Sequence, residues 1–348
     1  MSLIPSSNKL KGAIVAYRPL RFSQVVGQTI GVKLIVSALV KDKLPRAMIL
    51  HGPSGVGKTT LARLVAAWYV CENRRDDVCG ACSMCHAVQD GNISDVVEFD
   101  AASNTSIEDI RQILDQCDYA PQYSTQKIFI IDEAHMLSRN AIAALLKTLE
   151  EAPDHIRFIL ATTELDKIPD AIASRCLCVS LHNISSNIMG QYFKEFAQDK
   201  SLKMDDDAIN LLVKLSHGSM REGISVCNQA ILLADENKID VALLSSIASY
   251  VDASKIQQLA QLMIDGKFVE VFDFASQLLA EENANAIALL AQIIDCVKER
   301  CSVLSGDARS AYIKMLIDLN KLQQDSVKLT CVDQVVAIGL AKIAYAKP

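Results

Sequence analysis

A glycine-rich loop lies between an apolar segment that ends at His51 and a helical stretch that begins at Thr60, and this junction restricts the fold more than any other feature. The loop reads GPSGVGKT from Gly52 to Thr59. Glycines in this context let backbone N–H groups converge on phosphate oxygens at a helix N-terminus. The sequence therefore predicts a phosphate-binding loop on which the chain binds and hydrolyses a nucleoside triphosphate. We expect this nucleotide to be ATP.

The residues of this loop have distinct expected roles. Lys58 can reach the β and γ phosphates, and the Thr59 hydroxyl can hold Mg²⁺. The residues expected to surround the phosphates are Gly52, Gly55, Val56, Gly57, Lys58, Thr59 and Thr60. The alternative, a glycine turn without a ligand, does not account for the order of strand, loop and helix.

A pair of carboxylates provides a second sign of the same chemistry. The apolar segment Ile128–Ile131 runs directly into Asp132 and Glu133. We expect Asp132 to hold Mg²⁺ directly or through water, and Glu133 to polarise the attacking water in phosphoryl transfer. An exposed turn after a buried strand is the alternative interpretation.

Length and periodicity predict more than one domain. The chain has 348 residues, which exceeds the size at which one hydrophobic core keeps growing. From about residue 47 to residue 181, short apolar runs alternate with amphipathic stretches, which indicates a parallel sheet covered by helices. The expected strands are Met48–His51, Val96–Asp100, Lys127–Ile131, Ile156–Ala161 and Cys176–Leu181. The predicted fold class is α/β followed by all-α.

Beyond Leu181 the apolar residues recur at helical spacing, so the remainder is expected to be helical. We expect an ATPase domain at residues 1–182 and two helical domains at residues 183–250 and 251–348. One apolar stripe in the last domain comprises Ala286, Leu289, Leu290 and Ile293. It fits either an intramolecular core or a contact with a neighbouring subunit.

Four cysteines are crowded into the segment 71–85. Cys71, Cys79, Cys82 and Cys85 can close a tetrahedral Zn²⁺ site, which would be structural because it leaves no position for an activated water. In a reducing compartment such crowding favours metal over disulfides. The loop between them carries Arg74, Arg75, Asp76 and Asp77, which we interpret as a solvated hairpin tip.

Charge and hydropathy limit the partners. The formal net charge of −6 provides no overall attraction for nucleic acid, so contact with DNA would depend on local groups or on other subunits. No apolar run approaches the length needed to span a membrane, and the segment Met1–Lys11 lacks the apolar core of a secretory signal. We expect a cytoplasmic protein without a membrane partner.

The order of these elements resembles the gamma/tau subunits of bacterial DNA polymerase III, a family of AAA+ clamp-loader ATPases. The similarity runs from about Tyr17 to at least Arg221. The motifs that carry it are YRP at 17–19, VVGQ at 25–28, the phosphate-binding loop, the four cysteines, DAAS at 100–103, DEAHMLS at 132–138, LLKTLEE at 145–151 and SRC at 174–176.

The resemblance implies a RecA-like AAA+ domain with a zinc-binding insertion, a three-helix lid domain and a helical collar domain. It further implies that five subunits form a ring that loads a sliding clamp onto primed DNA. In the family, residues that match Arg18, Val25 and Val26 border the adenine pocket. Residues that match Thr163 and Arg221 act as the first and second sensors, and Arg175 matches the arginine finger that acts on a neighbour's ATP.

The sequence departs from its relatives at two places. Residues 104–106 read NTS, without the basic side chains that some relatives carry there, so a phosphate contact would rest on N–H groups capped by Thr105 and Glu108. Glu222 and Gly223 follow Arg221, and a glycine in a helix lowers its stability. The chain ends at Pro348, near the expected end of the collar.

Two other functions remain open at this point. One is a non-hydrolysing AAA+ scaffold, against which the intact Lys58, Thr59, Asp132 and Glu133 argue. The other is a hexameric AAA+ motor that remodels DNA, such as a junction helicase. The four-cysteine insertion disfavours this class, because such motors do not normally carry it.

Overall fold

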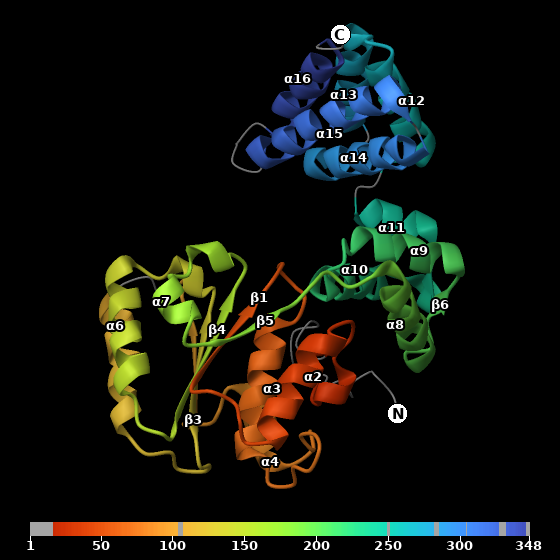
Figure 1. Ribbon diagram of the computed structural model, residues 1–348. Helices are drawn as coiled ribbons and strands as arrows, with labels where there is room; N and C mark the ends of the chain where they lie inside the picture. Colours follow the sequence, from red (N-terminus) through yellow and green to blue (C-terminus); the bar gives the residue numbers. More distant parts are fainter. Residues whose placement is uncertain are drawn as a thin grey trace. The chain divides into compact units, whose positions relative to one another are not determined.

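The chain folds into two compact units, Met1–Asn228 and Gln229–Pro348 (Figure 1). The computed structural model describes residues 17–103, 107–248, 251–281, 285–303, 305–326 and 332–345. The division into domains at residues 182 and 250 stays a prediction.

A five-stranded parallel sheet forms the centre of the first unit, with the strand order β2-β3-β4-β1-β5. The strands are β1 (Ala47–His51), β2 (Val96–Asp100), β3 (Lys127–Asp132), β4 (Ile156–Thr162) and β5 (Leu177–Ser180). The carboxyl ends of β1, β3 and β4 meet at one edge of the sheet, because His51 pairs with Thr162 and Ile131 with Leu160. The five predicted strands are confirmed, each within a residue at either end.

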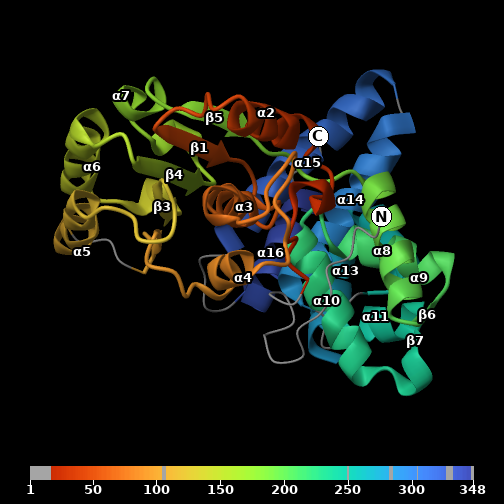
Figure 2. The same cartoon turned by 90° about the horizontal axis from the view of Figure 1, so that it is seen from below.

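Both faces of the sheet are buried beneath helices. Side chains alternate between faces along each strand, so Ile128 and Ile130 join one core while Phe129 and Ile131 join the other. Helices α2 (Thr29–Val40), α3 (Lys58–Val70) and α4 (Ser83–Asp90) cover the first face, whereas α5 (Ile107–Leu114) and α6 (Arg139–Glu151) cover the second (Figures 1 and 2). Burial on both sides explains why the central strands β1, β3 and β4 are nearly continuous apolar runs, whereas the edge strands β2 and β5 are partly exposed.

The rest of the first unit consists of short connecting elements and a helical segment after the sheet. Its remaining elements are η1 (Phe22–Gln24), η2 (Asp115–Asp118), η3 (Ala134–Met136), η4 (Leu165–Lys167), α7 (Asp170–Ala173), α8 (Ser186–Asp199), β6 (Lys203–Met204) and α9 (Asp206–Leu215), followed by α10 (Met220–Leu233), which continues into the second unit. The purely helical character predicted after Leu181 is wrong in a detail, because β6 and β7 (Lys238–Ile239) are two-residue strands.

Gly223 allows a close contact within this helical segment. A Cβ at this position would lie 2.6 Å from the ring of Phe193 in α8 and 2.4 Å from the Ser216 hydroxyl. Real Cβ atoms do not approach other atoms so closely. The loss of helix propensity at Gly223 is therefore accompanied by closer packing between α8 and α10.

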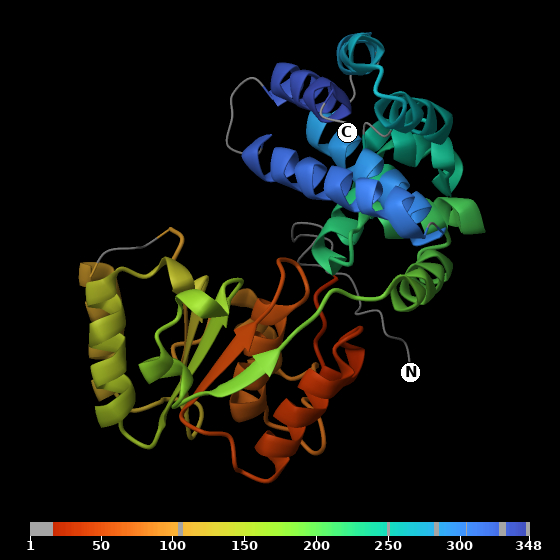
Figure 3. The same ribbon diagram turned by 45° about the horizontal axis from the view of Figure 1, so that its top comes forward.

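The second unit is a helical bundle (Figure 3, blue). It contains η5 (Asp235–Asn237), β7, α11 (Val241–Ile247), α12 (Ala253–Ile264), α13 (Phe268–Glu281), α14 (Ala286–Val303), α15 (Gly306–Ser326) and α16 (Val332–Tyr345). The stripe of Ala286, Leu289, Leu290 and Ile293 lies in its core and is at most 3% exposed. This confirms the intramolecular interpretation of that stripe. Within the described ranges, no helix is both long and apolar enough to cross a membrane.

Candidate functional site

The predicted phosphate-binding loop connects β1 to α3 and depends on its glycines. Gly52 has a φ of +146°, and a Cβ there would lie 2.1 Å from the carbonyl oxygen of Leu181. Gly57 has a φ of +107° and is the residue before the first turn of α3. Only glycine adopts these conformations without strain, so the loop leaves its N–H groups at the start of α3 available to an anion.

Lys58 is only 6% exposed, at the first position of α3. Its ammonium donates hydrogen bonds to the carbonyl oxygens of Gly52 at 2.9 Å and Pro53 at 2.8 Å. Burial lowers the pKa of Lys58, while the carboxylates of Glu133 and Asp132 act in the opposite direction. The ammonium thus stands within the loop, close to both acidic residues.

Thr59 and Asp132 form the pair expected for Mg²⁺. The Thr59 hydroxyl donates a hydrogen bond of 2.5 Å to Oδ2 of Asp132, at the end of β3. Oδ1 of the same carboxylate accepts the backbone N–H of Glu133 at 3.0 Å. A hydroxyl and a carboxylate are hard oxygen ligands, which fits Mg²⁺ chemistry.

Glu133 lies in a strained backbone conformation, with a φ of +47°. Such a conformation is uncommon for a residue with a side chain, although Asp42 and Ser201 outside the site also adopt it. The Thr163 hydroxyl donates to Oε2 of Glu133 at 3.3 Å. Thr163, which matches the first sensor of the family, therefore contacts Glu133.

His135 also contacts Glu133, and the sequence reasoning gave it no role. Its Nδ1 lies 3.5 Å from Oε2 of Glu133 and 3.1 Å from the Thr162 hydroxyl, while Nε2 lies 3.3 Å from Oε1 of Glu164. The imidazole is only 8% exposed. His135 is held by Thr162, at the end of β4, and by Glu164, two residues later. It therefore contacts the Glu133 carboxylate from a fixed position.

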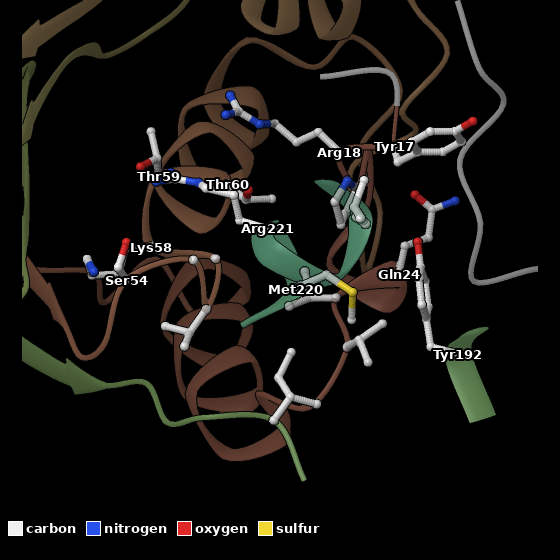
Figure 4. A pocket seen from close by; sticks show the side chains of 18 of the residues that line it. Tyr17, Arg18, Gln24, Ser54, Lys58, Thr59, Thr60, Tyr192, Met220 and Arg221 are labelled. Carbon is white, nitrogen blue, oxygen red and sulfur yellow. The ribbon is translucent and has the colours of Figure 1, made fainter. Parts of the chain in front are cut away.

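A pocket opens beside the loop (Figure 4). The loop residues Ser54 to Thr60, together with Asp132 and Glu133, line its phosphate side. A second group, which we call the base-side wall, comprises Tyr17, Arg18, Pro19, Gln24, Val25 and Val26. The remaining lining residues are Ile184, Tyr192, Met220, Arg221 and Ile224. The structure thus brings together the predicted Arg18, Val25, Val26 and Arg221 with the loop.

Positive charge accumulates around this pocket. Burial, followed by the like charges of Arg63 and Arg221, lowers the pKa of Arg18 to about 10, so its guanidinium stays charged at neutral pH. Within the described part of the chain, Nη1 of Arg18 is buried without a hydrogen-bond partner. The backbone N–H of Arg221 donates to the Gly55 carbonyl at 3.4 Å, which holds the start of α10 against the loop. An anionic ligand in the pocket would provide an acceptor for Nη1 of Arg18.

Arg175 lies away from the pocket. Its guanidinium pairs with Glu150 at 2.8 Å and donates to the Ala171 carbonyl at 2.7 Å. The side chain is 47% exposed, and it does not line the pocket of its own chain.

Gln28, the last residue of the VVGQ motif, connects the loop to the chain that leaves the sheet, a role that the sequence did not indicate. Gln28 is only 4% exposed. Its amide donates to the His182 carbonyl at 2.7 Å, and its carbonyl accepts the His182 N–H at 3.2 Å. The same amide lies 3.4 Å from the carbonyl oxygen of Val56.

The four predicted cysteines converge. The sulfur atoms of Cys71, Cys79, Cys82 and Cys85 all lie within 4.8 Å of one another, a spacing compatible with one metal ion. N–H groups of Cys82 and Ala81 donate to the Cys79 sulfur at 3.3 and 3.5 Å. Four sulfurs with backbone donors are a donor set that fits Zn²⁺.

The protonation of these thiols depends on their surroundings. Burial acts to raise the pKa of Cys79, but the N–H groups of Ala81 and Cys82 outweigh it and lower the value to about 6. Burial raises the pKa of Cys71 and of Cys85. A cation bound between the sulfurs would favour the thiolate form of all four.

The interpretation of Asp77 as part of a solvated tip is wrong. Arg75 and Asp76 are exposed, but Asp77 is half-buried and its carboxylate accepts the backbone N–H groups of Phe22 and Ser23, each at 3.0 Å. Arg74 donates to the Trp68 carbonyl at 2.8 Å.

The capping role predicted for Thr105 falls outside the described residues.

Comparison with known proteins identifies relatives. Residues 27–185 match the family model described as DNA polymerase III, delta subunit. The chain is 41% identical over 226 residues to the gamma/tau subunit of Mycoplasma pneumoniae, covering 65% of this chain and 33% of that protein. It is 31% identical over 336 residues to the tau subunit of Escherichia coli, covering 95% of this chain and 52% of that protein.

A shorter relative is the gamma subunit of Buchnera aphidicola from Schizaphis graminum. It is 40% identical over 222 residues, which cover 64% of this chain and 61% of that protein. The chain therefore spans between a third and about three fifths of the length of these relatives.

Solved structures with a similar fold include the RuvB Holliday junction branch migration motor of Thermotoga maritima. It has 18% identity and a TM-score of 0.50, covering 72% of this chain and 80% of that chain. A variant of the same motor has 17% identity and a TM-score of 0.51, with coverage of 80% and 88%. At this identity the likeness establishes a shared fold.

Proposed function

The chain is a homologue of the gamma/tau subunits of bacterial DNA polymerase III, and from this premise we propose that it is an ATP-hydrolysing motor subunit of a clamp loader. In this function, ATP binding and hydrolysis drive the loading of a sliding clamp onto primed DNA. The observation that carries the proposal is the convergence of Lys58, the Thr59–Asp132 pair and Glu133 in one pocket. The chain itself does not polymerise DNA.

The loop and its neighbours are proposed to bind ATP with Mg²⁺. Lys58 exchanges its contacts with the Gly52 and Pro53 carbonyls for phosphate oxygens. Thr59 and Asp132 hold the Mg²⁺, which supplies charge neutralisation on the phosphates when bound. Val25 and Val26, with the stem of Arg18, border the base, and Arg221 responds to the γ-phosphate.

Glu133 is proposed to orient and polarise the attacking water. Its carboxylate is directed by Thr163 and His135, whose contacts lie at 3.3 and 3.5 Å. Such fixed orientation of a catalytic carboxylate is a major source of rate enhancement in phosphoryl transfer. Thr163 corresponds to the sensor role expected from the family.

Arg175 is proposed to act on the ATP of a neighbouring subunit. Its half-exposed position outside its own pocket leaves it accessible to another chain. The ion pair with Glu150 would be exchanged for the γ-phosphate when subunits assemble, because a guanidinium binds phosphate through the same paired N–H donors.

The partners follow from the same premise. We propose a five-subunit ring with other clamp-loader subunits, held together by the helical collar at residues 251–348, with the lid at 183–250. Ile313 and Ile317, one helical turn apart on α15, are 45% and 63% exposed, which supports a subunit contact through the second unit. The assembly would act on the sliding clamp and primed DNA in the cytoplasm.

The four-cysteine cluster is proposed to bind one structural Zn²⁺. The sulfurs fill four positions and leave none for a reacting water. This insertion also favours a clamp-loader subunit over a RuvB-like remodelling motor. The likeness of this chain to RuvB is a likeness of fold. A non-hydrolysing scaffold is disfavoured by the intact Lys58 and Glu133.

The proposal is tested by ATP turnover in an assembly reconstituted from this chain and the other clamp-loader subunits. Turnover should rise when primed DNA and the clamp are added together, and less when either is added alone. A rate independent of both would contradict the proposed function.

A further inference from the structure

The four-cysteine loop holds the segment that forms the base-side wall of the pocket. Oδ1 of Asp77 accepts the N–H groups of Phe22 at 3.0 Å and of Val78 at 2.7 Å, and Oδ2 accepts the N–H of Ser23 at 3.0 Å. Asp77 lies two residues before Cys79, so one carboxylate joins the loop to the first turn of η1.

A second set of contacts ties the same two segments together. Arg21 donates from Nε at 2.9 Å and from Nη2 at 2.5 Å to the carbonyl oxygen of Cys79. Gly80 has a φ of +65°, and a Cβ there would lie 3.0 Å from the Leu20 carbonyl oxygen. In α4, which contains Cys85, Gln89 donates to the Pro19 carbonyl at 3.2 Å.

The apolar core continues these polar contacts. Phe22 is 2% exposed and belongs to the same cluster of buried residues as Cys71, Cys85 and Val78. One side of the segment 19–24 therefore packs on the cysteine loop. On its other side, Arg18, Pro19, Gln24, Val25 and Val26 line the pocket.

We propose that the four-cysteine loop is the support of the base-side wall, and that Asp77 is a positioning residue for the nucleoside half of the bound nucleotide. This deepens the proposed function and rests on it, because it assigns to the metal-binding loop a role in nucleotide affinity. The metal state of the cysteines then sets how well the wall is formed. No residue from 71 to 85 lines the pocket.

The division of the pocket makes the effect selective. The phosphate side belongs to β1, α3 and β3, which the central sheet holds in place. The base side belongs to a segment whose only regular structure is the three-residue η1. Its position depends on the contacts from Asp77, Arg21 and Gln89. Loss of these contacts should weaken recognition of adenosine and leave recognition of the triphosphate intact.

The test compares two ligands on the full chain with Zn²⁺ bound. Affinities for Mg·ATP and for inorganic tripolyphosphate are measured by calorimetry for the parent chain, Asp77→Ala and the control Asp76→Ala. Apparent affinity falls in proportion to the fraction of molecules in which the binding-competent wall is formed. A wall formed in about a tenth of the Asp77→Ala molecules would bind ATP about tenfold more weakly than the parent, which is the expected result. Its affinity for tripolyphosphate should stay within about twofold of the parent value, because substitutions away from a site usually have small effects and Asp77 does not line the pocket.

Two further measurements separate positioning from general destabilisation. The zinc content of Asp77→Ala should equal that of the parent, because all four cysteines remain. Hydrogen exchange of peptides covering residues 19–24 should be faster in Asp77→Ala than in Asp76→Ala, whereas exchange in α3 should be unchanged. Arg21→Ala, which removes the contacts to the Cys79 carbonyl, should shift the two affinities in the same selective way.

An equal loss of affinity for both ligands would overturn the inference and leave the proposed function standing. An unchanged affinity for ATP in both Asp77→Ala and Arg21→Ala would do the same. Failure of the parent chain to bind ATP at all would overturn the proposed function, and the inference with it. A selective loss of ATP affinity with zinc retained is the expected result.

Discussion

The hydroxyl of Thr59 donates a 2.5 Å hydrogen bond to the carboxylate of Asp132, although the two residues are 73 positions apart in the sequence. The contact joins the first turn of α3 to the end of β3, at the sheet edge where β1 and β4 also end. In parallel α/β sheets, ligands bind at this edge. The two groups proposed to hold Mg²⁺ are therefore in direct contact.

Lys58 and Glu133 should have separable roles. Lys58→Ala removes the ammonium proposed to bind the phosphates and should weaken ATP binding by roughly ten- to a hundredfold, the effect of losing a charged hydrogen bond. Glu133→Gln keeps the shape of the side chain and should bind ATP normally while turnover falls by about a hundredfold or more. Binding is measured by calorimetry and turnover by phosphate release.

The matched control for Lys58 is Lys43→Ala, because Lys43 is exposed in the loop after α2. It should leave binding and turnover unchanged. Hydrolysis by Glu133→Gln at the parent rate would mean that another group activates the water.

His135 and Thr163 should act through Glu133. His135→Ala and Thr163→Val each remove one contact with the carboxylate, so each should lower turnover about tenfold with little change in ATP affinity. Because both act on one carboxylate, their effects should not add in the double variant. The effect of either variant should disappear in a chain that also carries Glu133→Gln. Additive losses in the double variant, or losses that persist beside Glu133→Gln, would show that the two residues act elsewhere.

The four-cysteine site should contain one structural metal ion. Metal analysis of chain purified without chelators should give about one Zn²⁺ per chain, as four sulfur ligands require. Cys82→Ser should lower the zinc content and the thermal midpoint, since the metal stabilises the folded loop. Cys178→Ser is the control, because Cys178 is an exposed cysteine outside the cluster. Absence of zinc from the parent chain would contradict the assignment.

Arg175 should act across a subunit boundary. Arg175→Ala should bind ATP normally in the isolated chain, because its side chain lies outside the pocket. In an assembly it should lower turnover by roughly three to five orders of magnitude, as loss of an arginine finger does. In mixed assemblies, a chain with Arg175→Ala and an intact Lys58 should still hydrolyse ATP when its neighbour supplies Arg175. Activity that follows Arg175 within the same chain would contradict a trans role.

The sequence was sufficient for the sheet and for the phosphate side of the site. Strands such as Ile128–Ile131 are buried on both faces, so they are continuous apolar runs that can be recognised locally. The loop and its carboxylates carry their signal within a few residues of one another. The four cysteines are close in the sequence as well as in space.

Residues whose partners are distant in the sequence could not be found in this way. Gln28 is defined by its contacts with His182, and His135 by its contacts with Thr162 and Glu164. Asp77 lies among charged residues that pattern alone assigns to solvent, yet it binds the backbone of Phe22 and Ser23. For Gly223, helix propensity predicted only a loss of stability. Its close approach to the ring of Phe193 is a tertiary contact, which local propensity does not describe.

The most direct test of the account is whether this chain's ATP site drives a clamp onto DNA. Labelled clamp, primed circular DNA and an assembly containing this chain are mixed with ATP, and the DNA is isolated by gel filtration. The account predicts that clamp is retained on circular DNA with the parent chain, is released when the circle is cut, and is absent with Lys58→Ala. Retention that is equal with Lys58→Ala, or that needs no ATP, would contradict it.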